Sequence, residues 1–395
     1  MNTRNKLAVS LLAAAVSVLS ATASAQTASA AGGSLAQDRP IGNLEAVHEF
    51  YDAMPTGVTR APNGRIFVNF PRWGDDVPFT VGEIVGDRVV AYPNAAMNRP
   101  DKSHPAASLL SVQSVVADYR NRLWILDTAA PSFSAPLQGG AKLIAVDLAT
   151  NKVVKTIVFK PDVLLPTTYV NDVRFDFRAG SEGVAYITDS SANGPGGIIV
   201  VDLASGTAWR KLTAHYSAQV DPAFVAVVEG REMRTASPSG RRPPLHIASD
   251  GIALSSDGKT LYYSPLSSRH LFSVPTAMLR DRNVPEADVE AAVKDLGEKG
   301  ASDGLEADAS GAVYAGDYER NSIRKMNADG SWETIAHDPR ILWPDTMSVG
   351  TDGYLYFTAN QLNRMAQFNG GVDMRRKPYT LFRIKIDASP VTLQP

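Results

Sequence analysis

The chain of 395 residues carries 39 lysines and arginines against 41 aspartates and glutamates, is 44% hydrophobic and contains no cysteine. This length exceeds the usual single-core domain, so the sequence predicts two domains or one large closed architecture. Because the charge is near balance and there is no long basic run, a nucleic-acid partner is not expected, and the absence of cysteine excludes disulfides.

The first 25 residues have the pattern of a secretory signal peptide. Arg4 and Lys6 precede an apolar run at 7–19, and the small residues at 23–25 offer a cleavage site. A retained membrane anchor is the alternative, but the run of 13 residues is shorter than the ~20 that a spanning helix needs. We therefore expect an exported protein, periplasmic or extracellular, with no membrane span after cleavage and a net charge of about −4, since 37 basic residues remain against 41 acidic ones.

Residues 26–43 are rich in Ala, Gly and Ser and are expected to form a flexible lead-in. From 44 to 388 one pattern recurs: an alternating apolar strand, a turn of Gly, Asn or Asp, and a second strand with an aromatic residue, which together predict a β-hairpin. Six copies begin at Thr56, Gln113, Asn171, Asp250, Asp303 and Asp345. Their separations of 57, 58, 79, 53 and 42 residues approach the ~40–50 of propeller blades.

Further alternating stretches such as 141–159 supply two outer strands for each hairpin. The sequence therefore predicts an all-β, six-bladed β-propeller. A β-helix would need a shorter period, and a parallel α/β sheet would need helices between strands, whereas only 284–297 has a helical pattern. A closed ring leaves no open sheet edge, so we expect the N-terminal strand at 44–52 to pair with the C-terminal strand at 379–387 in the last blade.

The repeat also predicts which side chains meet on the propeller axis. The innermost strand of a blade begins at the mouth of the central channel, so the six starting residues are expected to converge there. Asp250, Asp303 and Asp345 are the candidate catalytic residues. Three carboxylates around one narrow axis require either a cation or raised pKa values. A polar, water-filled channel without a catalytic role is the alternative.

Candidate ligand-binding residues come from the same region. They are Gln113, Asn171, Asn360 and Trp343. The return strands add a second set of polar residues, Asp127, Asp189 and Asp317, for which loop capping is the simpler interpretation of at least the first and last.

Other catalytic signatures are absent from the sequence. It has no G-x-S-x-G, H-E-x-x-H or P-loop motif. His246, four residues before Asp250, is a possible proton carrier at the mouth. The long insertion at 215–244 carries four arginines and is either a lid over the acidic mouth or a solvated loop.

Five segments carry a resemblance to a known family. They are 69–84, 111–129, 171–176, 249–279 and 342–362, and together they resemble the major royal jelly protein/yellow family in its bacterial, L-dopachrome tautomerase-related branch. The likeness runs in order from about residue 45 to 386. It implies a secreted six-bladed propeller. Insect yellow relatives are linked to dopachrome conversion, some salivary members bind biogenic amines in the channel, and royal jelly members have no established catalysis.

A more distant resemblance is to the gluconolactonase/regucalcin group of propellers, which hold a divalent cation on the axis. It implies Ca²⁺ as a cofactor, with Asn171 and Asp250 as metal ligands. Thr56 stands where that group has a glutamate and Gln113 where an asparagine is common, so the four-ligand set is incomplete in this chain.

Two functions follow from these observations. In the first, the channel carboxylates catalyse proton transfer on a small cyclic molecule, as in dopachrome-like tautomerisation or lactone hydrolysis. In the second, the acidic mouth binds a cationic or aromatic molecule without turnover, with Trp73, Trp343 and Phe70 as apolar walls. The partner in either case is a small molecule.

Overall fold

The computed structural model describes residues 38–236 and 240–395, and the predicted signal peptide and most of the predicted lead-in lie outside these residues. In the described part, six antiparallel sheets of four strands each and one two-stranded ribbon make up the strand content. Each sheet follows the chain from its inner to its outer strand, with the last sheet completed by the N-terminal strand. The predicted all-β, six-bladed propeller is therefore confirmed.

The first three blades take their strands consecutively from the chain. Blade one comprises β2 (Val58–Arg60), β3 (Ile66–Asn69), β4 (Val81–Val85) and β5 (Arg88–Ala91). Blade two comprises β6 (Val112–Ala117), β7 (Arg122–Asp127), β8 (Lys142–Asp147) and β9 (Lys152–Val158). Blade three comprises β10 (Val170–Asp176), β11 (Val184–Asp189), β12 (Gly197–Asp202) and β13 (Ala208–Lys211).

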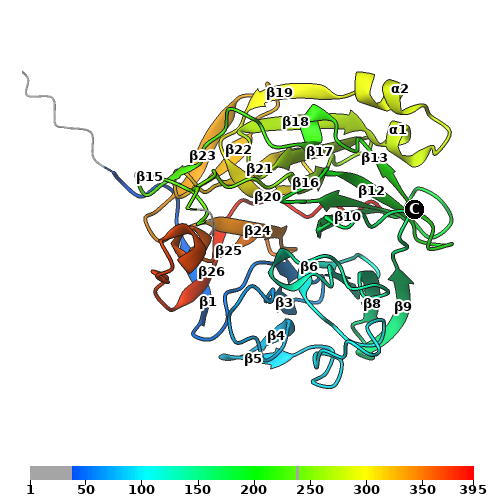
Figure 1. The fold of residues 1–395 in the computed structure, drawn as a ribbon, viewed down its shortest axis with the longest axis horizontal. Helices are drawn as coiled ribbons and strands as arrows, with labels where there is room; N and C mark the ends of the chain where they lie inside the picture. Colours follow the sequence, from blue (N-terminus) through cyan, green and yellow to red (C-terminus); the bar gives the residue numbers. More distant parts are fainter. Residues whose placement is uncertain (1–37, 237–239) are drawn as a thin grey trace, which may run out of the picture. The chain divides into compact units, whose positions relative to one another are not determined.

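The second half of the chain builds the other three blades. Blade four comprises β16 (Ser249–Leu254), β17 (Thr260–Pro265), β18 (His270–Pro275) and β19 (Lys294–Glu298). Blade five comprises β20 (Ser302–Ala307), β21 (Val313–Asp317), β22 (Ser322–Met326) and β23 (Trp332–His337). Blade six comprises β24 (Pro344–Val349), β25 (Tyr354–Ala359), β26 (Tyr379–Lys385) and β1 (Glu45–Phe50). Figure 1 shows β6, β10, β16, β20 and β24 nearest the centre, with β5, β9, β19 and β23 toward the rim.

The two ends of the propeller close the ring as predicted. β1 pairs with β26 in antiparallel register, with Phe50 opposite Tyr379 and Ala46 opposite Phe382. This pairing gives β26 two neighbours and leaves β1 as the outer strand of blade six. Ile41, inside the predicted lead-in, also forms a bridge with His337 of β23. The N-terminal segment is therefore tied to both of the last two blades.

The hydrophobic core is divided among the spaces between neighbouring blades. The cluster with Phe67 and Ile125 joins blades one and two, and the cluster with Trp124 and Ile187 joins blades two and three. Equivalent clusters join each of the following pairs, and the largest one joins blade six back to blade one. Since every blade is packed on both faces, the ring is held by sheet-on-sheet packing and leaves its axis to polar side chains.

A shared irregularity in the inner strands aims side chains at the axis. The pairing of the inner hairpin shifts register at the start of the inner strand in blades two to six, at 112–114, 170–173, 249–252, 302–305 and 344–347. A β-bulge inserts an extra residue and re-aims the side chains beside it. In all five blades the shift falls on the residue that the repeat predicts for the channel mouth.

Glycine allows neighbouring inner strands to approach at this level. A Cβ on Gly251 would collide with the backbone oxygen of Asp303, and a Cβ on Gly304 would collide with the backbone oxygen of Asp345. Each glycine follows an axial aspartate directly. Blades four, five and six therefore sit close enough for their aspartates to share one cavity.

Two parts of the prediction differ in detail. The expected helix at 284–297 is helical only as α2 (Glu286–Ala291), and its last part is β19, because blade four needs a fourth strand. A second short helix, α1 (Thr276–Arg280), precedes it. Among the described residues, no helix is long and apolar enough to cross a bilayer.

The C-terminal tail runs across the far end of the channel. Ala309, just after β20 of blade five, donates its N–H to the backbone oxygen of Ser389 in the tail (2.9 Å). Phe177, just after β10 of blade three, donates its N–H to the backbone oxygen of Leu393 in the tail (3.0 Å). Leu393 is 5% exposed and packs with the core between blades three and four. The tail thereby covers a small lower cavity of about 110 Å³ that is lined by the ends of the inner strands. The other end of the channel is the one that opens to the candidate site.

Candidate functional site

Five of the six predicted axial residues line one cavity of about 430 Å³, here called the acidic cavity. They are Gln113, Asn171, Asp250, Asp303 and Asp345. All five are at least nine-tenths buried. Thr56 is the exception, since it is fully buried and accepts a hydrogen bond from Asn69 Nδ2 (2.9 Å). Asn69 also accepts the backbone N–H of Thr56 (3.1 Å), so both the backbone and the hydroxyl of Thr56 are bonded to Asn69, and Thr56 does not line the cavity.

Asp250 and Asp303 form the centre of the acidic cavity. Their carboxyl groups hydrogen-bond each other, which requires that the pair holds a proton. Burial, then the charges of Asp303 and Asp345, raise the pKa of Asp250 well above its ordinary value. Burial also raises the pKa of Asp303 to about 6, although the N–H of Trp343 and the bond to Asp250 act in the opposite direction. Near neutral pH we therefore assign the shared proton to Asp250 and the charge to Asp303.

Asp345 is the third carboxyl group and is held from behind. Asn360 donates Nδ2–H to Asp345 Oδ2 (2.6 Å), and the Asn360 Oδ1 accepts the N–H of Leu362 (3.0 Å). Burial raises the pKa of Asp345 well above its ordinary value, and the charge of Asp303 raises it further. Asn360 is fully buried and lies outside the cavity lining. It orients Asp345, and its role as a ligand-binding residue stays a prediction.

Trp343 connects the cavity to the core. Its Nε1–H donates to Asp303 Oδ2 (2.7 Å), and its ring stacks on Tyr318 with centroids 4.1 Å apart. Its backbone lies in the left-handed region at φ 56°, which is a strained conformation for a bulky residue. Packing in the core thus holds the Trp343 ring in a position where its Nε1–H bonds Asp303, the ionised member of the Asp250–Asp303 pair.

The opposite wall carries polar groups that bond each other. Trp73 Nε1–H donates to the Tyr169 hydroxyl (2.9 Å), which donates to Gln113 Oε1 (3.0 Å). Asn171 Nδ2–H donates to Ser190 Oγ (2.8 Å), and the Ser190 hydroxyl lies 3.1 Å from Asp250 Oδ2. Tyr169, directly before β10, and Ser190, directly after β11, were not singled out from the sequence. Their position next to Asn171 and Asp189 in the aligned repeats was the available signal.

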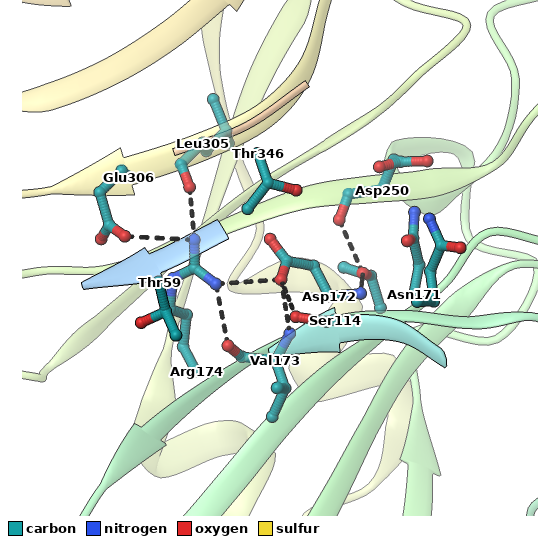
Figure 2. Close-up of polar contacts among 12 residues, drawn as sticks. Thr59, Ser114, Asn171, Asp172, Val173, Arg174, Asp250, Leu305, Glu306 and Thr346 are labelled. Atoms are coloured by element: carbon teal, nitrogen blue, oxygen red, sulfur yellow. Dashed lines mark hydrogen bonds and ion pairs between the residues drawn. The ribbon is translucent and has the colours of Figure 1, made fainter. Parts of the chain in front are cut away.

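A buried ion cluster lies below the acidic cavity. Arg174 donates to Asp172 Oδ1 (3.1 Å) and to the backbone oxygens of Val173 and Leu305, and its guanidinium lies 3.5 Å from Glu306. Figure 2 shows Arg174 between Asp172 and Glu306. Ser114 of blade two donates to the same Asp172 oxygen (2.7 Å). The cluster links blades two, three and five across the axis.

This cluster influences the carboxyl groups above it. The charge of Asp172 raises the pKa values of both Asp303 and Asp345. Asp172 immediately follows Asn171, and strict strand alternation would send the two side chains to opposite faces. The β-bulge turns both toward the channel. Asp172 and Arg174 were for this reason not recognised in the sequence.

The polar residues of the return strands, Asp127, Asp189 and Asp317, cap loops. This is the simpler interpretation that the sequence favoured for Asp127 and Asp317. Asp127 pairs with the fully buried Lys142 (2.7 Å) and accepts three backbone N–H bonds. Asp189 pairs with Arg210 (2.8 Å), and Asp317 pairs with Arg320 (3.0 Å). The side chains of this set lie outside the acidic cavity.

The apolar and basic candidates divide between the cavity and its surroundings. Trp73 and Trp343 line the acidic cavity, whereas Phe70 packs in the core between blades six and one. His246 is exposed at the rim. The insertion contributes Thr235, Pro243 and Pro244 to the wall, but its Arg231 and Arg242 line a separate groove. Arg231 and Arg242 therefore lie outside the acidic cavity.

The donor set fits a calcium ion poorly. Among the described residues, no group of three or more His, Asp or Glu side chains is arranged to hold a metal. Asp250 and Asp303 are engaged with each other, and Gln113 Oε1 accepts the tyrosine hydroxyl. The predicted metal ligands Asn171 and Asp250 both hydrogen-bond the hydroxyl of Ser190, which lies between them. Thr56 is absent from the cavity wall. The calcium assignment remains a prediction, and no chemical step is derived from it.

Comparison with known proteins supports the predicted family. A family model described as major royal jelly protein matches residues 110–390. Protein yellow of Drosophila erecta is 28% identical over 255 residues, which is 60% of this chain and 43% of yellow. Protein yellow of Drosophila subobscura is 26% identical over 304 residues, which is 72% of this chain and 49% of yellow. The chain thus spans about half the length of the curated relatives it matches.

Solved structures show the same fold at low identity. The calcium-binding protein regucalcin from Agrobacterium tumefaciens has a TM-score of 0.53 at 13% identity, covering 88% of this chain and 97% of regucalcin. At such identity the likeness concerns the fold alone. The family model, by contrast, covers well over half of the sequence. This chain therefore belongs to the major royal jelly protein family.

Proposed function

We propose that this protein binds a small cationic molecule in the acidic cavity. The observation that carries the proposal is the composition of the wall: three buried aspartates face a space of about 430 Å³, and no lysine or arginine is among the described residues that line it. A buried carboxylate without a basic partner is costly, and an ammonium group entering the cavity would relieve that cost. A cation is the ligand that gains most from such a site.

The remaining walls suit a ligand with an apolar ring. Trp73, Phe133 and Tyr169 lie on one side, and Leu245, Leu266 and Phe368 lie elsewhere around the mouth. Aromatic faces attract cations and stack on planar rings. We therefore propose an amine carried on a ring as the ligand class.

A catalytic role is the second candidate, and the Asp250–Asp303 pair favours it. A protonated Asp250 beside an ionised Asp303 provides a proton donor and a proton acceptor in one cavity. Asp303 would remove a proton from one position of a bound ring and Asp250 would deliver one to another. The net change is a tautomerisation of the dopachrome type, with no electrons transferred. Lactone hydrolysis is the weaker variant, because it was inferred together with a calcium site that the donor set fits poorly.

Calorimetric titration with 2-phenylethylamine tests the binding proposal. The wild type should bind, and Asp303→Asn combined with Asp345→Asn should weaken binding at least tenfold, because the ionised carboxylate and a second potential counter-charge are both lost. Asp257→Asn is the matched control, since Asp257 is an exposed turn residue whose carboxylate bonds only its own hairpin. Equal affinity of the wild type and the double variant would refute the proposal.

The catalytic candidate needs a separate assay. The loss of dopachrome absorbance should be faster with the wild type than with Asp303→Asn, which removes the proton acceptor while keeping the shape of the side chain. A rate unchanged by this substitution would exclude Asp303 as the base and leave the protein a binder.

We also propose export to the periplasm or the extracellular space. The proposal is supported by the signal-peptide pattern of the first 25 residues. N-terminal sequencing of the protein secreted or exported by its host should begin near residue 26. A protein that keeps Met1 and stays in the cytoplasm would contradict it.

A further inference from the structure

The loop between β7 and β8 has an unusual backbone beside the acidic cavity. Ala129, Ser132 and Phe133 all lie in the left-handed region, at φ 51°, 53° and 55°. The last two belong to the short 3₁₀ turn η1 (Pro131–Phe133). Left-handed conformations are unfavourable for residues other than glycine, and especially for a bulky aromatic one, and such strain concentrates at ligand-binding positions. The loop is fixed by the bond from the Ser132 N–H to the Arg72 oxygen (3.0 Å).

This loop lays the Phe133 ring flat on two other rings of the cavity wall. Phe133 stacks on Tyr169 with centroids 4.2 Å apart and planes 19° apart, and on Trp73 at 5.3 Å and 24°. Tyr169 is 2% exposed, whereas Phe133 is 36% exposed, and both line the acidic cavity. Phe133 is therefore the outer ring of the stack and covers a face of Tyr169.

The two underlying rings are anchored and the outer one is not. Trp73 and Tyr169 bond each other, and Tyr169 also bonds Gln113 on the cavity wall. Phe133 has no polar anchor and has its ring partly in solvent. Its stacking is opposed by the strain of its own backbone, which is comparable in size to a single ring stack. A competing planar ring could thus replace Phe133 at little cost.

We propose that Phe133 is a displaceable ring that occupies the aromatic subsite of the acidic cavity and thereby determines which ligands bind. In the complex the planar ring of the ligand takes the place of Phe133 over Tyr169 and Trp73. Its ammonium group then extends toward Asp250 and Asp345. This inference rests on the proposed binding function and adds to it a planar aromatic ring as the specificity element.

The test compares Phe133→Ala with the wild type by calorimetric titration. The probes are 2-phenylethylamine and 2-cyclohexylethylamine, which share an ammonium group but differ in the planarity of the ring. Phe133→Ala should bind the planar amine at least threefold more tightly than the wild type, with a smaller change for the cyclohexyl amine. Weaker binding of the planar amine by Phe133→Ala would overturn the inference, because Phe133 would then be a fixed wall that the ligand contacts.

Two further variants make the result specific. Phe133→Leu keeps apolar bulk without a flat stacking ring, and it should also favour the planar amine, but less than the alanine variant. Tyr216→Ala is the matched control, because Tyr216 is an exposed aromatic residue (61%) in another 3₁₀ turn, η2 (Tyr216–Ala218), away from the cavity. It should leave both affinities unchanged, and an equal gain in this control would overturn the inference.

A neutral planar probe separates this inference from the proposed function. Indole stacks without an ammonium group, so its binding does not depend on the aspartates. If neither protein binds the amines but Phe133→Ala binds indole more tightly than the wild type does, the cation proposal fails and the aromatic subsite stands. If the amines bind and Phe133→Ala gains nothing for indole or for the planar amine, the subsite fails and the cation site stands.

Discussion

Replacing Asp303 by asparagine is expected to stabilise the protein at neutral and alkaline pH. Burial raises the pKa of Asp303 from 3.8 to about 6. Between these values the folded protein holds a proton that the unfolded chain has released, so the free energy of unfolding falls as pH rises through this window. At about 1.4 kcal/mol per pKa unit, the folded state loses about 3 kcal/mol above pH 6. The amide side chain of the Asp303→Asn variant has no charge to bury, so the variant escapes this loss.

Denaturant unfolding of both proteins at pH 4 and pH 8 measures the effect. The variant and the wild type should be nearly equal at pH 4, and the variant should be more stable by about 3 kcal/mol at pH 8. Histidines such as His48, whose pKa burial lowers, titrate in the same range but are common to both proteins, so they cancel in the difference. A variant that is less stable than the wild type at pH 8, by the same amount as at pH 4, would refute the reasoning.

Three other predictions concern the surroundings of the acidic cavity. Millimolar Ca²⁺ should raise the melting temperature by less than about 1 °C relative to chelator, because the oxygens of the wall are already paired; a rise of several degrees would establish an ion site. Lys142→Met should destabilise the fold by about 3–5 kcal/mol, because it leaves Asp127 buried without its partner, yet ligand affinity should not change once the protein is folded. A specific loss of affinity would instead place Asp127 in the site. Leu393→Ala should cost about 2–4 kcal/mol in denaturant unfolding, because this side chain fastens the tail to the core; a neutral result would mean that the tail is not held there.

The propeller architecture was predictable because the hairpin pattern recurs six times in the sequence. Six hairpins of similar length dictate six blades, and the need to avoid open edges dictates the pairing of β1 with β26. Once the blades are aligned, rotation about the axis brings equivalent residues together. Asp250, Asp303 and Asp345 could therefore be placed in one site from residues far apart in the chain.

The details that escaped prediction depend on backbone irregularities. A bulge sends both Asn171 and Asp172 to the channel, and bonds to Asn69 hold Thr56 outside the cavity wall. Phe133 reaches the cavity through a left-handed backbone that its residue type disfavours. The local sequence pattern does not predict these bulges and left-handed residues, because contacts between blades impose them.

The aspartate cluster also suggests why the site is retained at a cost to stability. Three carboxyl groups are buried together, and two of them share a hydrogen bond that needs a proton. A neutral core of the same volume would be more stable. Residues that lower stability while converging on a cavity are typical of binding and catalytic sites.

Proton release on binding is the most direct measurement of whether a cation enters this cavity. Titration of the wild type with 2-phenylethylamine at pH 7, in buffers of different ionisation enthalpy, counts the protons exchanged. Because the pKa values of Asp250 and Asp345 are raised well above the ordinary value, an incoming ammonium group should displace about one proton per site. A binding heat that is the same in all buffers, for the wild type as for Asp250→Asn, would contradict a cation site built on these aspartates.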